Sequence, residues 1–339
     1  MIADSIGENE PMSTHGTAHH RAIARDGHTV AYTVHGESDG VPVVVLHGGP
    51  GSGSNAGALR LFDLARFRVV MVDQRGTGAS TPRGSVRHNG TRHLIRDLEA
   101  IRAQLGIVRW GVVGGSWGAA LALAYAGTYP ASVSGVVLRG LFLTTRREVR
   151  RLFVMSRSRA PSAWRDLMHA TLCERASSLP SACMQAMQVR THGRADTVAG
   201  AWRTYENAIL MQASSGSTAA RRQKASNRAS STTAKYRIQA HYLMHGCWLG
   251  ERRLMMHAKR AVASGVAIHA VHGSRDPVCP PGNLHRLMRA VPAVRGRFVD
   301  AGHLASDARL VQALVVAIEA VFLDRQRDDA NCPDRRTGR

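Results

Sequence analysis

The 339-residue sequence has few aromatic residues, few cysteines and few acidic residues. Its five cysteines form no C-x-x-C pair and no metal-site spacing, which argues against a disulfide-stabilised scaffold and favours a reducing compartment. No apolar run approaches the roughly 18 residues that a membrane-spanning helix needs. The first twenty residues also lack the apolar stretch of a secretory signal. We therefore expect a cytoplasmic protein without a membrane segment.

The shortage of acidic residues leaves a large positive charge. Lys and Arg number 45 against 24 Asp and Glu, which gives a formal net charge of +21. Such an excess is compatible with binding to nucleic acid or to an anionic membrane. However, no zinc-finger spacing, RNA-binding signature or basic heptad region accompanies it. An arginine-rich composition spread over a solvated surface explains the charge as well, so we expect no specific nucleic-acid partner. A nucleic-acid binder remains an alternative, and it predicts salt-dependent retention on a polyanion.

Short apolar runs alternate along the chain with segments of helical periodicity. Buried strands are predicted at 41–46, 68–72, 110–113, 133–138, 267–271 and 296–299, after an alternating strand at 28–35. Apolar residues at helical spacing predict helices at 93–105, 118–129 and 310–322. Strands that alternate with helices predict an α/β fold with a mostly parallel, doubly wound sheet.

The middle of the chain has a different pattern. Residues 142–263 show helical patterns and no convincing buried strand, which predicts a helical cap inserted into the α/β core. The predicted core is then 21–141 and 264–324, between tails at 1–20 and 325–339. Within the cap, residues 214–234 are rich in Ser, Thr, Ala, Arg and Lys, so we expect a flexible surface loop there. A nucleic-acid-binding arm is the alternative for this stretch.

The strongest local motif surrounds Ser116. Residues 114–118 read GGSWG and satisfy G-x-S-x-G, the nucleophile elbow of α/β-hydrolases. A serine hydroxyl is a poor nucleophile unless it projects clear of the backbone beside a base. A tight turn between a strand and a helix achieves this, and it requires very small neighbours such as Gly114 and Gly118. The predicted strand before the motif and the predicted helix after it supply that context, so we predict that Ser116 is a catalytic nucleophile.

A serine nucleophile also needs donors that stabilise the oxyanion. One predicted donor is the backbone N–H of Trp117, the residue after the serine. The second should come from the glycine-rich loop at 47–51 (HGGPG), directly after a buried strand. We assign it to Gly49, with a simple turn as the alternative for this loop.

The base and the acid are expected to follow the serine in the order Ser, Asp, His. Asp276 lies in a turn just after the strand at 267–271, and His303 lies between the last strand and the closing helix. His303 would accept the serine proton, and Asp276 would fix its tautomer and offset the imidazolium charge. Asp300 is the nearest competitor for the acid role, but it is too close to His303 in sequence to reach its ring easily.

These motifs together resemble the proline iminopeptidases (prolyl aminopeptidases), a family of α/β-hydrolases, from about residue 21 to 323. The matching segments are 47–51 (HGGPG), 73–82 (DQRGTGASTP), 110–118, 138–142 (LRGLF), 202–206 (WRTYE), 238–242 (IQAHY), 272–276, 279–280 and 301–303 (AGH). HGGPG together with DQRG and GGSWG is specific to this family within the α/β-hydrolases. The resemblance implies removal of an N-terminal residue, typically proline, from a peptide.

The resemblance also implies a substrate pocket in the cap. Cap carboxylates hold the free amine in this family, and Glu206 matches one of them, whereas Gln239 stands at the second position and carries no charge. Arg139, Phe142 and Cys279 are kept. The aromatic lining is thinner, because Leu243 and Leu152 stand where the family has aromatics. From the sequence alone, Glu206 could equally be a solvated helix charge, and Arg139 a salt-bridge partner.

The catalytic motifs thus support hydrolysis more firmly than they support proline as the substrate. The main expectation is an aminopeptidase that acts on short peptides. The alternative in the same fold is an esterase, lactonase or amide hydrolase for a small molecule, and a third reading is a binding protein that has lost catalysis. Because the triad supplies the nucleophile, the base and charge stabilisation, we expect no metal or cofactor. The oligomeric state is left open.

Overall fold

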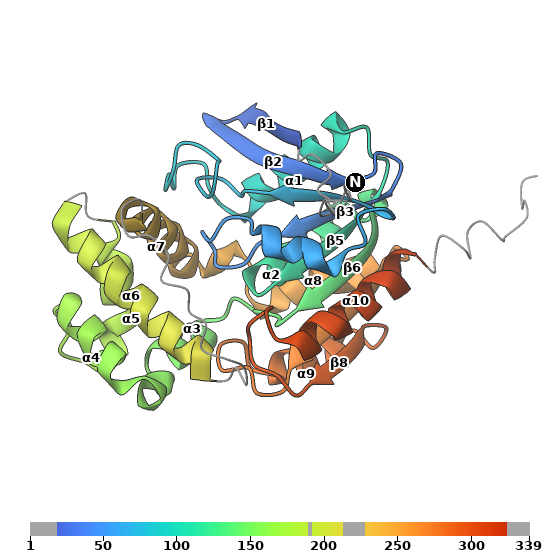
Figure 1. The fold of residues 1–339 in the computed structure, drawn as a ribbon. Coiled ribbons are helices and arrows are strands. Elements are labelled where there is room, and N and C mark those ends of the chain that lie inside the picture. The colour runs from blue at the N-terminus through green and yellow to red at the C-terminus, as the bar shows by residue number, and fades with distance from the viewer. Residues whose placement is uncertain (1–18, 189–191, 213–227, 324–339) are drawn as a thin grey trace, which may run out of the picture.

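The computed structural model describes residues 19–188, 192–212 and 228–323. Its centre is an eight-stranded sheet in the order β1-β2-β4-β3-β5-β6-β7-β8 (Figure 1). The strands are β1 (His19–Arg25), β2 (His28–Gly36), β3 (Val41–Leu46), β4 (Phe67–Val72), β5 (Trp110–Gly115), β6 (Val133–Arg139), β7 (Ala267–Gly273) and β8 (Arg295–Val299). Strands β4, β3, β5, β6, β7 and β8 pair in parallel, and β1 and β2 form an antiparallel hairpin that joins β4. The predicted α/β fold with a mostly parallel sheet is confirmed.

The chemistry of the central strands explains their position. In β5 the residues from Trp110 to Gly114 are buried, because helices cover both faces of the sheet and every side chain of a central strand meets apolar neighbours. One boundary of the prediction is wrong. The tail was predicted to end at residue 20, but β1 begins at His19 and pairs with β2 along its whole length. The rest of the predicted tails, residues 1–18 and 325–339, lies outside the described residues, as does residue 324.

Helices cover the two faces of the sheet and form a separate group at one end. The helices are α1 (Thr91–Gln104), α2 (Trp117–Thr128), α3 (Arg146–Phe153), α4 (Pro161–Ala170), α5 (Leu179–Ala186), α6 (His192–Gln212), α7 (Arg228–Met244), α8 (Glu251–Ala263), α9 (Gly282–Ala290) and α10 (Ala308–Phe322). Helices α1, α2, α8 and α9 contribute to one hydrophobic core on the sheet. Helix α10 and the short 3₁₀ helix η1 (Ala56–Leu61) pack on the opposite face.

Helices α3 to α7 lie beside the sheet and share a hydrophobic core of their own (Figure 1). Its largest buried side chains include Phe153, Trp202 and Tyr236. Helix α8, which the predicted cap includes, instead packs against α2 and buries Leu254 and Ala258 in the core of the sheet. The predicted division at residues 142 and 263 stays a prediction.

The predicted flexible loop at 214–234 falls only partly on described residues. Residues 213–227 lie outside the described part of the chain. Helix α7 begins at Arg228, so the end of the predicted loop is helical instead. Its Ser and Thr residues have modest helix propensity, but contacts with α5 and α6 hold α7 in the cap.

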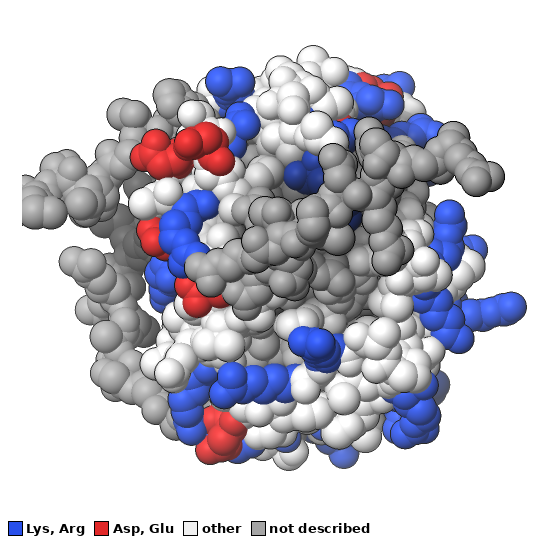
Figure 2. All heavy atoms as spheres, turned by 90° about the vertical axis from the view of Figure 1, so that its right-hand side faces the viewer, with Lys and Arg blue, Asp and Glu red and all other residues white. Residues whose placement is uncertain are grey.

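The positive charge is spread over the face of the molecule that Figure 2 draws. On the face drawn in Figure 2, Lys and Arg form separate groups between uncharged areas, with few Asp and Glu among them. In the described residues, no helix is both long and apolar enough to cross a membrane.

Candidate active site

The strand β5 and the helix α2 hold Ser116 in a sharp turn between them. The serine adopts φ 57° and ψ −117°, a left-handed conformation that non-glycine residues rarely adopt. Strain of this kind persists only where the surrounding structure fixes it, and the nucleophile elbow is such a place. The turn lifts the side chain out of the sheet at the carboxyl end of β5, where parallel strands place ligand sites.

Two glycines make the tight turn possible. A Cβ added at Gly114 would lie 2.2 Å from the carbonyl oxygen of Gly118. A Cβ added at Gly118 would lie 2.2 Å from the carbonyl oxygen of Leu46 in β3. Both distances are shorter than any tolerable contact, so the sequence spacing G-x-S-x-G is required by the packing of α2 against β3 and β5.

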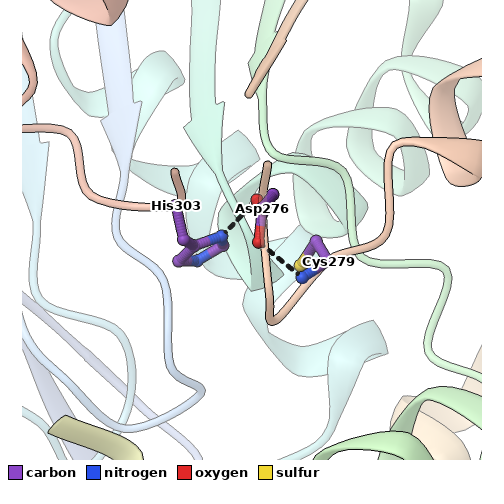
Figure 3. A group of neighbouring side chains, drawn as sticks. All are labelled: Asp276, Cys279 and His303. Atoms are coloured by element: carbon purple, nitrogen blue, oxygen red, sulfur yellow. Dashed lines mark hydrogen bonds and ion pairs between the residues drawn. The ribbon is translucent and has the colours of Figure 1, made fainter. Parts of the chain in front are cut away.

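His303 and Asp276 face one another at the ends of neighbouring strands (Figure 3). The ring nitrogen Nδ1 of His303 lies 2.6 Å from Oδ2 of Asp276. The second carboxylate oxygen, Oδ1, accepts hydrogen bonds from the backbone N–H groups of Val278 (2.9 Å) and Cys279 (2.8 Å). These bonds fix the carboxylate from one side, so it holds the imidazole from the other and leaves Nε2 of His303 for a reacting group.

The carboxyl group of Asp276 is ionised despite its burial. Burial alone would raise the pKa of Asp276, but the charge and hydrogen bond of His303 outweigh it and hold the pKa below its ordinary value. The competing acid, Asp300, has a side chain that is 68% exposed and pairs with Arg275 and Arg309. The geometry therefore favours Asp276 as the partner of His303.

A cavity of about 230 Å³ opens in front of the serine, between the sheet and the cap. Most of the predicted site residues line it: Gly49, Ser116, Arg139, Phe142, Glu206, Gln239, Cys279 and His303. The other two lie behind this lining, because Trp117 is fully buried at the start of α2 and Asp276 is covered by His303. Residues that are far apart in the sequence thus meet at one cavity.

The glycine-rich loop after β3 lies directly against Ser116. A Cβ added at Gly48 would lie 3.4 Å from the Cβ of Ser116. Gly49 has φ +117°, a conformation that favours glycine. On the other side of the serine, α2 begins at Trp117, and the first backbone N–H groups of a helix have no partner within the helix. The loop and the helix start are therefore both close enough to offer N–H groups to an oxyanion.

Arg139 and Cys279 border the triad without replacing any member of it. Arg139 donates a hydrogen bond of 2.5 Å from Nη1 to the carbonyl oxygen of His303, so it positions the loop that carries the base. The Sγ of Cys279 lies 3.9 Å from the Oγ of Ser116. Burial raises the pKa of the Cys279 thiol well above its usual value, which keeps it protonated.

Asp276, Cys279 and His303 are also close enough together to be considered as a metal site. The chemistry of these donors does not fit. The Nδ1 of His303 is already bonded to Oδ2 of Asp276, and Oδ1 of Asp276 already accepts two backbone N–H groups. The cluster is explained by the hydrogen bonds that its members make with one another and with the backbone.

Glu206 and Gln239 approach the cavity from two cap helices, α6 and α7. The Nε2 of Gln239 donates to Oε1 of Glu206 at 2.5 Å. The Glu206 side chain is 13% exposed, so the alternative that it is a solvated helix charge does not hold. Phe142 and Leu243 contribute apolar lining beside them.

Sequence reasoning missed two charged residues of the cavity wall. Glu148 accepts hydrogen bonds from the backbone at the start of α3 and from Asn283, so it has a structural role. Lys235 lies 3.6 Å from Glu206. A sequence prediction in which the helix began before Lys235 would have identified this residue. Lys235 and Gln239 are four residues apart and therefore share a helix face.

Known proteins resemble the chain in sequence over most of its length. A family model of the alpha/beta hydrolase fold matches residues 41–309. A proline iminopeptidase from Xylella fastidiosa is 35% identical over 87% of this chain and 93% of its own length. A proline iminopeptidase from Arabidopsis thaliana is 36% identical over 87% of this chain and 77% of its own length. These matches confirm the resemblance identified in the sequence.

Solved structures confirm the predicted α/β-hydrolase fold. 2-Hydroxy-6-oxo-6-phenylhexa-2,4-dienoate hydrolase from Rhodococcus sp. strain RHA1 superposes with a TM-score of 0.55 at 19% identity, covering 89% of this chain and 98% of its own. An esterase from Rhodococcus sp. ECU1013 gives a TM-score of 0.54 at 19% identity, covering 90% and 99%. At this identity the likeness concerns the fold alone.

Proposed function

Because the chain belongs to the proline iminopeptidase family of the α/β-hydrolases, we propose that it is a serine aminopeptidase that releases an N-terminal proline, or a similar residue, from short peptides. The observation that carries this proposal is the shared cavity. A serine in a nucleophile elbow and a His–Asp pair line or border one side of it, and a buried glutamate lies on the other. That arrangement suits a substrate with a scissile bond at one end and a positive charge at the other.

In this proposal the reaction begins at Ser116. The Nε2 of His303 accepts the hydroxyl proton while Oγ attacks the carbonyl carbon of the first residue. Asp276 stabilises the imidazolium through the 2.6 Å hydrogen bond at Nδ1. The backbone N–H groups of Trp117 and Gly49 are assigned to the oxyanion, where each fixed donor contributes about 3 kcal/mol to transition-state stabilisation.

The tetrahedral intermediate collapses when His303 gives its proton to the leaving amine. The peptide without its first residue departs, and the acyl group stays on Ser116 as an ester. Water then loses a proton to His303, attacks the ester carbonyl and releases the free amino acid, which restores the serine hydroxyl. Each step uses the same base and the same oxyanion donors, so one site catalyses both halves of the reaction.

A second candidate function is hydrolysis of an ester, lactone or amide of an uncharged small molecule. Two observations favour it. The apolar lining is mostly aliphatic (Leu152, Leu210, Leu243 and Val278), and the charge of Glu206 already has a partner within the protein, Lys235.

The test compares three substrates: prolyl-β-naphthylamide, its N-acetylated form and p-nitrophenyl acetate. We expect a higher kcat/KM for the free-amine prolyl compound than for its N-acetylated form, because only the free-amine compound has an ammonium that can bind at Glu206. Cleavage of p-nitrophenyl acetate with neither naphthylamide cleaved would reject the aminopeptidase and support the second candidate. No cleavage of any of the three would reject both.

The substitution Gln239→Glu should improve the use of free-amine substrates. It places a second carboxyl group within hydrogen-bonding distance of Glu206, where two like charges repel and a substrate ammonium relieves the repulsion. We expect the KM of prolyl-β-naphthylamide to fall about tenfold, which corresponds to about 1.4 kcal/mol of binding. Steady-state kinetics measure it. The exposed Gln185 on α5 supplies a matched control, since Gln185→Glu adds the same charge away from the cavity. If the KM changes no more in Gln239→Glu than in Gln185→Glu, Gln239 does not lie at the site that binds the substrate amine.

A further inference from the structure

The carboxylate of Glu206 has three hydrogen-bond donors and one nearby cation before any substrate arrives. Oε1 accepts hydrogen bonds from the indole of Trp202 (3.0 Å) and from Gln239 (2.5 Å). Oε2 accepts one from the hydroxyl of Tyr236 (2.8 Å) and lies 3.6 Å from the Nζ of Lys235. A carboxylate offers about four acceptor positions. Three hydrogen bonds take three of these positions and Lys235 lies beside the fourth, so a substrate ammonium that binds there must displace Lys235.

Three of the four groups are fixed. Trp202 and Tyr236 are fully buried, and Gln239 is 4% exposed. The rings of Trp202 and Tyr236 pack against each other with centroids 4.8 Å apart. Burial and the neighbouring Glu206 also raise the pKa of Tyr236, so its hydroxyl keeps the proton that it donates.

Lys235 is the group that can leave. Its side chain is 30% exposed, and its contact with Glu206 is the longest of the four. Its Nζ lies 4.7 Å above the centre of the Tyr236 ring, so the ammonium can stay near that ring or move into water on a flexible four-carbon stem. A partly exposed ion pair of this kind is weak enough for another cation to replace.

The oxygen of Gln239 indicates what replaces it. The Nε2 of this amide must face Glu206, because the opposite orientation would bring two oxygens together. Its Oε1 is then buried and has no hydrogen-bond partner among the described residues, and Gln239 is one of the residues that line the cavity. A buried acceptor without a donor is costly, and a protonated secondary amine carries two N–H groups. One can bind Oε2 of Glu206 while the other satisfies Gln239.

We infer that Lys235 is a displaceable internal counterion that occupies the ammonium site of the empty enzyme and so limits its affinity for free-amine substrates. The inference rests on the proposed function, because it concerns the same cavity. Lys235 is then a specificity-determining residue. Lys235 competes with the ammonium of a protonated substrate for the carboxylate of Glu206. Substrates without an ammonium are not affected by this competition.

The experiment measures the ratio of kcat/KM for prolyl-β-naphthylamide to kcat/KM for p-nitrophenyl acetate. In Lys235→Met the ratio should rise about fivefold, through a lower KM for the prolyl compound, because the competing charge is gone. Lys235→Arg keeps a cation and should keep the ratio near that of the unsubstituted enzyme. Lys259→Met makes the same chemical change on the exposed face of α8 and serves as the matched control.

An unchanged or lower ratio in Lys235→Met would overturn the inference, as would an equal rise in Lys259→Met. If the enzyme cleaves only the ester, the aminopeptidase proposal fails by itself, and the inhibition constant of pyrrolidine against ester hydrolysis becomes the readout. Pyrrolidine is a protonated secondary amine at neutral pH. Its inhibition constant should be about fivefold lower in Lys235→Met, and an unchanged constant would overturn the inference.

Discussion

The substitution Ser116→Ala should lower kcat/KM by on the order of 10⁵-fold for every substrate that the enzyme cleaves. The loss follows from the absence of the attacking oxygen, because the remaining oxyanion donors and His303 can only assist a slow attack by water. The expected fall is the same for prolyl-β-naphthylamide and p-nitrophenyl acetate, since both require the same acyl-enzyme. Single-point kinetics at high enzyme concentration are sufficient to measure it.

The fold of this variant should be unchanged. The hydroxyl of Ser116 has one hydrogen-bond partner among the described side chains, the Sγ of Cys279 at 3.9 Å, so its removal should alter the free energy of unfolding by less than about 0.5 kcal/mol. Thermal unfolding measures this. The exposed Ser177 in the cap provides Ser177→Ala as a control for the substitution itself. A folded Ser116→Ala enzyme with more than a few per cent of the activity would mean that another group is the nucleophile.

The positions of the proposed reacting groups could be predicted because each is tied to the end of a strand. Apolar runs identify the parallel strands, and the residue after each run must lie at the carboxyl edge of the sheet. Ser116 follows β5, and Asp276 and His303 follow β7 and β8. Since β5, β6, β7 and β8 are neighbours in the sheet, order along the chain translates directly into proximity.

The cap could be predicted only in outline. Its helices α6 and α7 have weak amphipathic patterns, and residues 228–234 are polar, so nothing in the sequence shows that a helix begins at Arg228. The groups that contact Glu206 from α7 can be identified only when that helix is known. Lys235 and Gln239 both approach Glu206 because α7 packs against α6, a tertiary contact that composition and periodicity do not encode.

Helix α8 is a second element whose packing partner could not be predicted from the sequence. Its alternation of apolar and charged residues predicts an amphipathic helix but not the surface that it covers. The contact is set by Gly127 in α2, where an added Cβ would lie 2.5 Å from the backbone of His257. A glycine in a small, apolar helix permits a close helix–helix approach, and such pairings are visible only in three dimensions.

The substitution Asp276→Asn should lower kcat by about 10³- to 10⁴-fold while the fold persists. The asparagine oxygen can still accept the backbone N–H groups of Val278 and Cys279, which places its amide nitrogen against Nδ1 of His303. An N–H at that position favours the imidazole tautomer with its proton on Nε2, the nitrogen that must accept the serine proton. Steady-state kinetics measure the loss. Asp300→Asn is the control, because Asp300 is exposed and pairs only with Arg275 and Arg309 among the described residues; a larger loss there would transfer the acid role to Asp300.

The stability that the unsubstituted protein has over Asp276→Asn should decrease as the pH falls. The pKa of Asp276 in the folded protein lies below its ordinary value of 3.8, because His303 outweighs the effect of burial. A lowered folded pKa stabilises the protein fully above the unfolded pKa, and this stability is lost as the pH falls through the folded pKa. The difference in Tm between the unsubstituted protein and Asp276→Asn should therefore be largest near neutral pH and shrink below about pH 4. A difference that grows in acid would show that the carboxyl group is protonated in the folded enzyme, and the imidazolium would then lack the charge on which the mechanism depends.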